Sequence, residues 1–172
     1  LHERSQTVLG MLDRTDAVFF RDNLLLQVGL HRSGCRGMLA FCRSCLAGRR
    51  GDYSSAFVLA TEAMRHYDAG RQALSAAEHD RWRNFYRADW LTNIGCTIYS
   101  LDTLRRYLRA LGDGPHFFSW YKQYVIPEAE RRIYLENTQR RTLDDDELAD
   151  LLKEKLPAVS EGSPRKPGHG GA

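Results

Sequence analysis

The stretch LTNIGCTIYSLDTLRRYLRAL, residues 91–111, has the clearest helical pattern in the chain. Its leucines and isoleucines recur every three or four residues, which places them along one face of an α-helix. Gly112 follows as a C-cap and Pro115 lies just beyond it, so the pattern predicts a helix that ends abruptly. The arginines at 105–109 are expected to face outward or sideways.

Two longer helical patterns precede this stretch. The first runs from Val18 to Leu46 and contains the glycine-rich sequence SGCRG at 33–37, which predicts either close packing of another helix or a kink. The second runs from Tyr53 to Ala77, and alanines on its inner stripe indicate tight packing against a neighbour. Between the two lies GRRGD at 48–52, where glycine ends one helix and the aspartate begins the next.

Shorter helices are predicted nearer the two ends of the chain. Residues 2–12 form a short amphipathic pattern, and Thr15 or Asp16 is available as the N-cap of the helix that follows. Asp144 and Glu147 have capping-box spacing ahead of a leucine-rich helix. No strand-period alternation of useful length occurs. We therefore predict an all-α fold, a bundle of about five to seven helices.

The composition is that of an ordinary globular domain. Of 172 residues, 42% are hydrophobic and 27% are charged, which is enough to build a core. We expect one domain over residues 1–156 and a disordered tail, rich in Pro, Gly and Ser, over residues 157–172. Because the chain starts inside a helical pattern without a Met, we expect it to be a fragment of a longer polypeptide, with flanking domains as its partners.

The charge balance and the hydropathy of the chain limit which other partners are expected. The 25 basic residues nearly balance the 22 acidic ones, so nucleic acid is not an expected partner. No apolar run approaches the roughly 20 residues of a membrane-spanning helix, and no membrane partner is expected. The chain carries no signal-peptide pattern, and its compartment is not specified by the sequence.

The four cysteines do not form a recognisable metal motif. Cys42 and Cys45 make a single CxxC within the helical sequence FCRSCLAG, with no second pair. We therefore expect reduced, half-buried cysteines, no metal site and no cofactor. Glu62 and His66 are four residues apart, whereas di-iron bundles use a spacing of three on paired helices.

The segment from Trp82 to Asn93 is the candidate binding site, because aromatic rings alternate there with Arg, Asp and Asn. The apolar face of a sugar stacks on Trp or Tyr, while carboxylates, amides and guanidinium groups bind its hydroxyls. The ligand-binding candidates are Trp82, Tyr86, Arg87, Asp89, Trp90 and Asn93. If the segment is a helix, Trp82, Phe85, Tyr86 and Asp89 share one face. A helix junction with core aromatics has the same composition, and so does a surface that stacks bases.

Two runs carry a resemblance to a class of known proteins. WRNFYRADWLTNI at 82–94, followed by SLDTLRRYLRALGDGPHFF at 100–118, resembles helical regions that accompany the catalytic domains of large, multidomain bacterial carbohydrate-active proteins of glycoside-hydrolase type. The resemblance lies in the pattern of aromatic, Arg and Asp residues over 78–120. It implies an accessory helical domain beside a barrel or sandwich, and it assigns no catalytic residue.

Three functional hypotheses follow. The leading one is a non-catalytic helical domain of a larger protein that contributes to carbohydrate binding. The second is part of the active site of a glycoside-processing enzyme, with its carboxylates drawn from Asp80, Asp89 and Asp102. The third is a protein-interaction or oligomerisation bundle, with the aromatic cluster at 117–124 as its contact surface.

Overall fold

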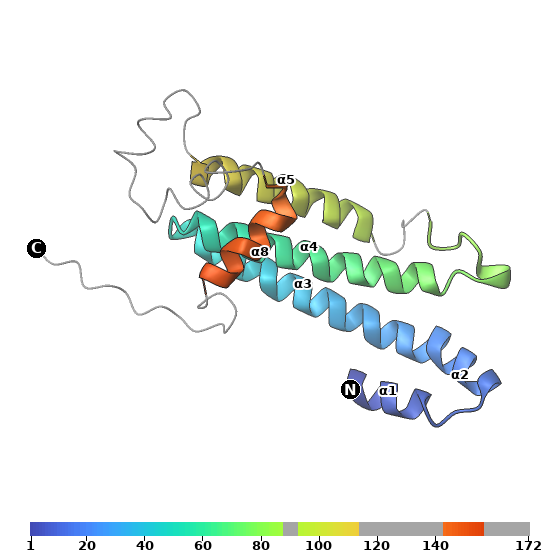
Figure 1. Cartoon of the computed structure of the whole chain (residues 1–172). Coiled ribbons are helices and arrows are strands. Elements are labelled where there is room, and N and C mark those ends of the chain that lie inside the picture. The colour runs from blue at the N-terminus through green and yellow to red at the C-terminus, as the bar shows by residue number, and fades with distance from the viewer. Residues whose placement is uncertain (88–92, 114–142, 157–172) are drawn as a thin grey trace, which may run out of the picture. The chain divides into compact units, whose positions relative to one another are not determined.

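The computed structural model describes residues 1–87, 93–113 and 143–156 (Figure 1). Every regular element in these ranges is helical, which confirms the predicted all-α class. The α-helices are α1 (His2–Leu9), α2 (Arg14–Phe20), α3 (Leu26–Arg49), α4 (Tyr53–Ala76), α5 (Ile94–Asp113) and α8 (Asp145–Lys155). The aromatic cluster at 117–124 and the tail at 157–172 lie outside the described residues.

The chain divides into two compact units. The first unit comprises Leu1–Cys42 and Glu62–Thr103, and the second comprises Arg43–Thr61 together with the described residues from Leu104 onward. Each unit contains its own cluster of buried apolar side chains. That residues 1–156 form a single domain stays a prediction.

In the first unit, α2 begins at Asp13, whose carboxylate accepts the backbone N–H groups of Thr15 and Asp16, each at 2.9 Å. The prediction of Thr15 or Asp16 as N-cap is therefore wrong, because the short side chain of Asp13 already binds the free N–H groups of the first turn. A π-helical turn, Arg21–Leu25, joins α2 to α3. The buried cluster of this unit consists of Leu26, Leu74 and Ala77.

The glycine-rich part of α3 is not a break, because the helix continues through residues 33–37. Gly37 is buried, and a Cβ atom built there would lie only 2.5 Å from Cε2 of Tyr67 in α4. Gly29 and Gly34 have no such neighbour within 4 Å. Of the glycines in this part of α3, Gly37 alone therefore fits the close-packing interpretation, and the alternative of a helix break is wrong.

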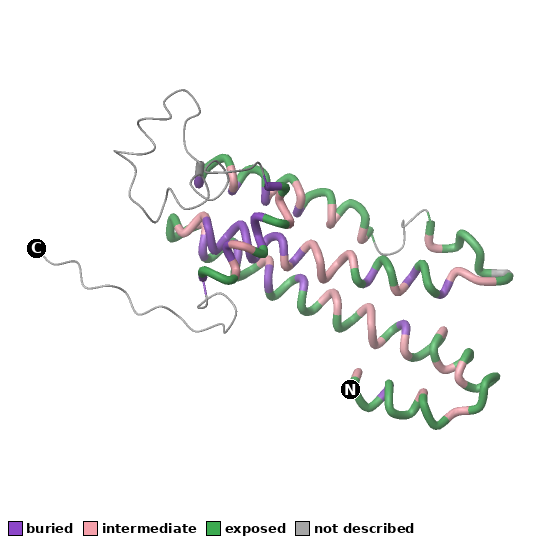
Figure 2. Tube along the Cα trace, viewed as in Figure 1, coloured by how far each residue is buried: buried purple, intermediate pink, exposed green. Residues whose placement is uncertain are grey.

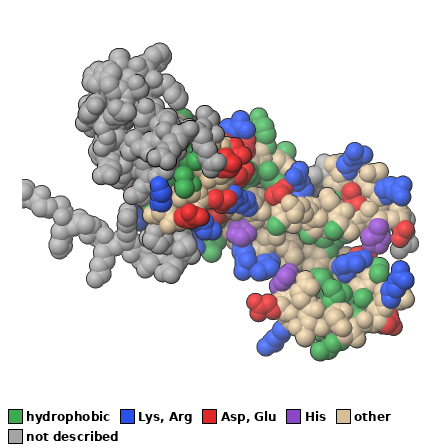
Figure 3. Space-filling model, in the orientation of Figure 1, with side chains coloured by type: hydrophobic (Ala, Val, Ile, Leu, Met, Phe, Trp, Pro, Cys, Tyr) green, Lys and Arg blue, Asp and Glu red, His purple; other side chains and the backbone are tan. Residues whose placement is uncertain are grey.

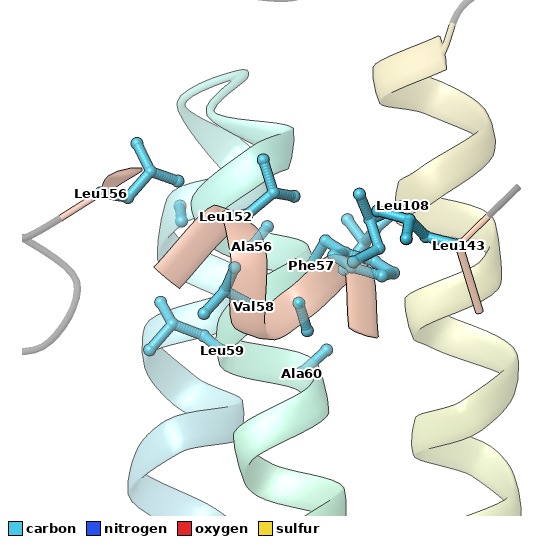
Figure 4. Close-up of a cluster of buried hydrophobic side chains, with 12 residues drawn as sticks. Ala56, Phe57, Val58, Leu59, Ala60, Leu108, Leu143, Leu152 and Leu156 are labelled. Atoms are coloured by element: carbon cyan, nitrogen blue, oxygen red, sulfur yellow. The ribbon is translucent and has the colours of Figure 1, made fainter. Parts of the chain in front are cut away.

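The core of the second unit joins the start of α4 to α8 (Figure 4). Phe57, Leu148 and Leu152 are fully buried there. The carboxylate of Asp144 accepts the N–H groups of Asp146 and Glu147 at 2.9 and 2.8 Å, and the Glu147 carboxylate accepts the Asp144 N–H at 3.3 Å. This reciprocal arrangement confirms the predicted capping box at the start of α8.

Arg105 is only 7% exposed, which contradicts the prediction that it faces outward or sideways. Its Nη1 donates a hydrogen bond to Oδ1 of Asp146 at 3.1 Å, and Arg109 pairs with Asp145. Both carboxylates belong to the acidic first turn of α8. A guanidinium group can be buried when carboxylates bind it, so α8 changes the environment that the α5 sequence alone predicts.

Candidate ligand-binding cavity

A cavity of about 840 Å³ lies in the first unit, lined by α2, the π turn, the start of α3 and residues 77–86. Its apolar lining consists of Val18, Phe19, Ala77, Trp82, Phe85 and Tyr86. Its polar lining consists of Arg14, Thr15, Asp22, Asn23, Gln27, His79 and Asp80. Pockets of this size that combine apolar walls with a few polar groups are typical of small-molecule sites. Single π turns inserted in helices also occur frequently at functional sites.

The aromatic wall of the cavity is a compact loop. Asp80–Trp82 form a single 3-10 turn, and Asp80 and Asn84 adopt left-handed conformations, with φ of 49° and 63°. Trp82, Phe85 and Tyr86 therefore do not share the face that a helix would give them, because a left-handed residue at 84 interrupts a right-handed helix. Asp89 lies outside the described residues. The backbone N–H of Tyr86 donates to Oε1 of Glu78 at 2.6 Å, and this bond closes the loop.

Three aromatic rings of the loop pack edge to face. The ring centroids of Trp82 and Phe85 lie 5.1 Å apart at 81°, and those of Phe85 and Tyr86 lie 5.1 Å apart at 89°. Trp82 is 43% exposed and Phe85 is 48% exposed, so these two rings are not core residues. Tyr86 is half-buried and packs against the Leu26–Leu74–Ala77 cluster. The helix-junction interpretation with core aromatics therefore applies to Tyr86 and not to the other two.

His79 connects the loop to the π turn. Its Nε2 lies 2.6 Å from Oδ2 of Asp22, and its Nδ1 lies 3.2 Å from Oδ2 of Asp80. Both ring nitrogens donate to carboxylates only when the imidazole is protonated. The hydrogen bond to Asp80, then that to Asp22, raises the pKa of His79 above its ordinary value. On its other side, Asp22 accepts a hydrogen bond from Nε of Arg21 at 3.2 Å.

The structure brings together only some of the residues predicted from sequence. Trp82 and Tyr86 line the cavity. Arg87 is exposed, and its Nη1 donates to Oδ1 of Asn84 at 3.5 Å. Asn93 is exposed in a left-handed conformation just before α5, where its carbonyl accepts the N–H of Thr97. Neither Arg87 nor Asn93 is part of the lining, and the candidates at 89 and 90 lie outside the described residues.

Sequence reasoning missed the side of the cavity formed by α2 and the π turn. Phe19 has the spacing of an apolar stripe, which predicts a core position, yet it lines the open cavity. Asp22 and His79 are 57 residues apart, and no spacing rule connects them. The sequence contains one indication of this part of the site, because His79 and Asp80 directly precede the aromatic run.

The cavity lining contains two carboxylates, Asp22 and Asp80, and both contact His79. Of the two predicted acids that the structure describes, Asp80 lines the cavity. Asp102 is half-buried in α5 and lies outside the lining. The third predicted acid, Asp89, is outside the described residues. His79 lies between the carboxylates of Asp22 and Asp80 and contacts both, so it can orient them relative to each other.

The cysteines differ from their predicted environment. All four are free and exposed, whereas half-buried positions were expected, because α3 and α5 turn these faces away from their packed sides. In the described parts of the chain, no group of three or more His, Cys, Asp or Glu side chains is arranged to hold a metal ion. No described helix combines the length and the apolar character that a membrane crossing requires.

Comparisons of the chain with protein-family models, curated proteins and solved structures found no match. The fold and the site therefore define the chain only by class, as an all-α protein with an open aromatic and polar cavity in its first unit. The resemblance to accessory regions of carbohydrate-active proteins stays an expectation.

Proposed function

We propose that this chain is a non-catalytic helical domain of a larger protein and binds a neutral carbohydrate in the cavity of its first unit. One observation carries the proposal: aromatic rings and hydrogen-bonding side chains surround the same cavity of about 840 Å³. A sugar ring has an apolar face and a rim of hydroxyl groups, so a ligand of this class uses both kinds of lining at once.

The exposed aromatic rings supply the apolar contact. Trp82 and Phe85 keep about half of their surface open to solvent, and Phe19 is exposed on the opposite side of the lining. The loop that holds these rings is closed by the bond between Tyr86 and Glu78 and tied to the π turn by His79. Because the rings are held in place before binding, a ligand loses less conformational entropy on docking.

The charges around the cavity favour a neutral ligand over a phosphate or an ammonium ion. The lining combines the basic side chains of Arg14 and His79 with the carboxylates of Asp22 and Asp80, so charges of both signs are present. Asn23 completes the set with an uncharged amide. Figure 3 shows acidic and basic side chains interspersed over the visible described surface, which likewise does not favour a highly charged ligand.

Isothermal titration calorimetry against a panel of cello-, xylo-, manno- and chito-oligosaccharides tests this proposal. We expect saturable heat with at least one of them, and Trp82→Ala is expected to weaken that affinity about tenfold or more. Tyr99→Ala is the matched control, because Tyr99 is an exposed aromatic residue of α5 outside the cavity lining. If no sugar binds, or if Trp82→Ala binds as well as the control, the proposal is wrong.

A glycoside-processing role is the second candidate, and one observation favours it. Asp22 and Asp80 approach the same imidazole from its two nitrogens and line the same cavity. Hydrolysis would require one of them to act as an acid and the other as a base or nucleophile. Release of reducing ends from the same oligosaccharides, abolished in Asp80→Asn, would support this role. Binding without any release would leave only the non-catalytic function.

A further inference from the structure

Four residues of α3 in the first unit form an apolar row that stays exposed in the part of the chain that the structure describes. Cys35, Met38, Leu39 and Cys42 follow the spacing i, i+3, i+4, i+7 and therefore share one helix face. Met38 is 53% exposed and Leu39 is 51% exposed, and both cysteines are exposed. We call these four residues the α3 stripe.

The α3 stripe is not the face with which α3 packs in its own unit. Gly37 and Ala40 are buried, and Gly37 is the position that approaches Tyr67 of α4. Buried and exposed residues alternate along α3 with the helical period (Figure 2). The helix thus has a second apolar face, and a row of this kind indicates a docking site more strongly than scattered apolar residues do.

The charged residues that α3 itself places beside the α3 stripe are all basic. The sequence of α3 contains no Asp or Glu, and Arg32 and Arg36, both exposed, follow one border of the stripe one turn apart. The contact that Arg32 makes with α1 is to a ring nitrogen of His2, at 3.3 Å. An apolar row bordered by guanidinium groups is complementary to an apolar row bordered by carboxylates.

We propose that the α3 stripe binds an acidic amphipathic helix of a partner protein. Apolar side chains of the partner pack on Met38 and Leu39, and its Glu or Asp side chains pair with Arg32 and Arg36. This is the groove-and-helix mode of recognition, in which residues at i, i+3, i+4 and i+7 of one helix contact an apolar surface of the other protein. The charged border sets the orientation and excludes basic helices.

Two other occupants fit the surface less well. A second copy of the chain would bring the same arginines to the interface and no α3 carboxylate to balance them. A lipid surface is typically bound by a helix with Trp or Phe on its apolar face and many Lys or Arg side chains on the other. The α3 stripe has neither aromatic ring, and three arginines of α3 follow its border, Arg32, Arg36 and Arg43.

A synthetic helix of about 18 residues serves as the probe, with leucines at i, i+3, i+4 and i+7 and glutamates along one border. Fluorescence anisotropy of the labelled peptide against the whole chain measures its binding. Alkylation by iodoacetamide, followed by mass spectrometry, maps the bound surface. We expect saturable binding that slows alkylation of Cys35 and Cys42, while Cys96, an exposed cysteine of α5, reacts at an unchanged rate.

Substitutions separate the apolar and the charged contributions. Met38→Gln is expected to weaken peptide binding about tenfold. Arg36→Glu is expected to weaken binding of the glutamate peptide and to strengthen binding of a matched peptide in which lysine replaces every glutamate. Tyr99→Ser, an exposed substitution on α5, is the control and leaves both affinities unchanged.

Several results would overturn the proposal. These are the absence of saturable binding, equal affinity for the lysine and glutamate peptides, and unchanged affinity in Arg36→Glu. Sedimentation of the chain with phosphatidylcholine vesicles containing a quarter phosphatidylserine, lost in Met38→Gln, would assign the α3 stripe to a membrane instead. Dimerisation measured by light scattering and lost in the same variant would assign it to a second copy.

Discussion

Three glycines of α3 allow a direct test of the packing in the first unit. Gly29, Gly34 and Gly37 are all interior to the same helix, so helix propensity treats them alike. Their surroundings differ. A Cβ atom at Gly37 would lie 2.5, 2.7 and 3.0 Å from three ring atoms of Tyr67, whereas one at Gly29 or Gly34 would have no such neighbour within 4 Å.

The expected effects of alanine at these positions have opposite signs. In a helix interior, Ala is more favourable than Gly by about 1 kcal/mol, and nothing opposes this gain at Gly29 or Gly34. At Gly37 the new methyl group must push the ring of Tyr67 away, and overpacking of this kind costs about 1–3 kcal/mol. The difference predicts that Gly37→Ala destabilises the chain by about 1 kcal/mol.

Urea denaturation followed by circular dichroism at 222 nm measures these free energies of unfolding. We expect Gly34→Ala to raise the midpoint and Gly37→Ala to lower it. In a Tyr67→Ala background the ring is gone, so Gly37→Ala is expected to become stabilising by about 1 kcal/mol. If Gly37→Ala stabilises the unmodified chain as much as Gly34→Ala does, the inferred contact with Tyr67 is refuted.

Three further predictions concern His79 and α8. The raised pKa of His79 implies that its contribution to stability is complete below its unfolded-state pKa of about 6.5 and is lost as the pH rises through the higher folded-state pKa. NMR titration of the imidazole ring should give a midpoint above pH 6.5. His79→Gln should remove this part of the pH dependence of the free energy of unfolding. A midpoint at or below pH 6.5 would contradict the contact of His79 with two carboxylates. Asp144→Ala removes the N-cap of α8 and is expected to lower the free energy of unfolding, measured by urea denaturation, by about 1 kcal/mol. If that free energy does not change, the capping box is contradicted. Leu148→Ala leaves a cavity at a fully buried site and is expected to cost about 3 kcal/mol in the same assay, while a cost below about 1 kcal/mol would show that Leu148 is not in a packed core.

Much of the local structure could be predicted from the sequence. The long helices, the loop between α3 and α4 and the capping box at Asp144 and Glu147 all occur as expected. These features depend on contacts between residues no more than about four positions apart, such as helical periodicity and caps. The predictions of local structure that proved wrong also concerned neighbouring residues. The predicted C-cap at Gly112 is wrong, because α5 continues to Asp113. Asp13 took the capping role predicted for its neighbours. Asn84 adopted a left-handed conformation, which excludes the helical arrangement considered for the aromatic run.

The candidate site was predictable only in part. Two of the binding candidates from the aromatic run, Trp82 and Tyr86, line the cavity, and their role in binding stays a prediction. The part of the cavity lining formed by α2 and the π turn could not be predicted from the sequence. Asp22 belongs to a π turn whose backbone has no distinctive sequence pattern, and its contact with His79 spans 57 residues.

The sequence by itself determined that this chain is all-α and where its long helices lie. Only the tertiary structure decided which polar groups are paired and which apolar faces are buried. Arg105 is buried because the carboxylate of Asp146, 41 residues away, binds it. Gly37 is constrained and Gly34 is not, because only Gly37 faces the ring of Tyr67. The physical reason is that periodicity gives the direction of a side chain relative to its own helix, whereas burial and pairing depend on which distant segment packs there.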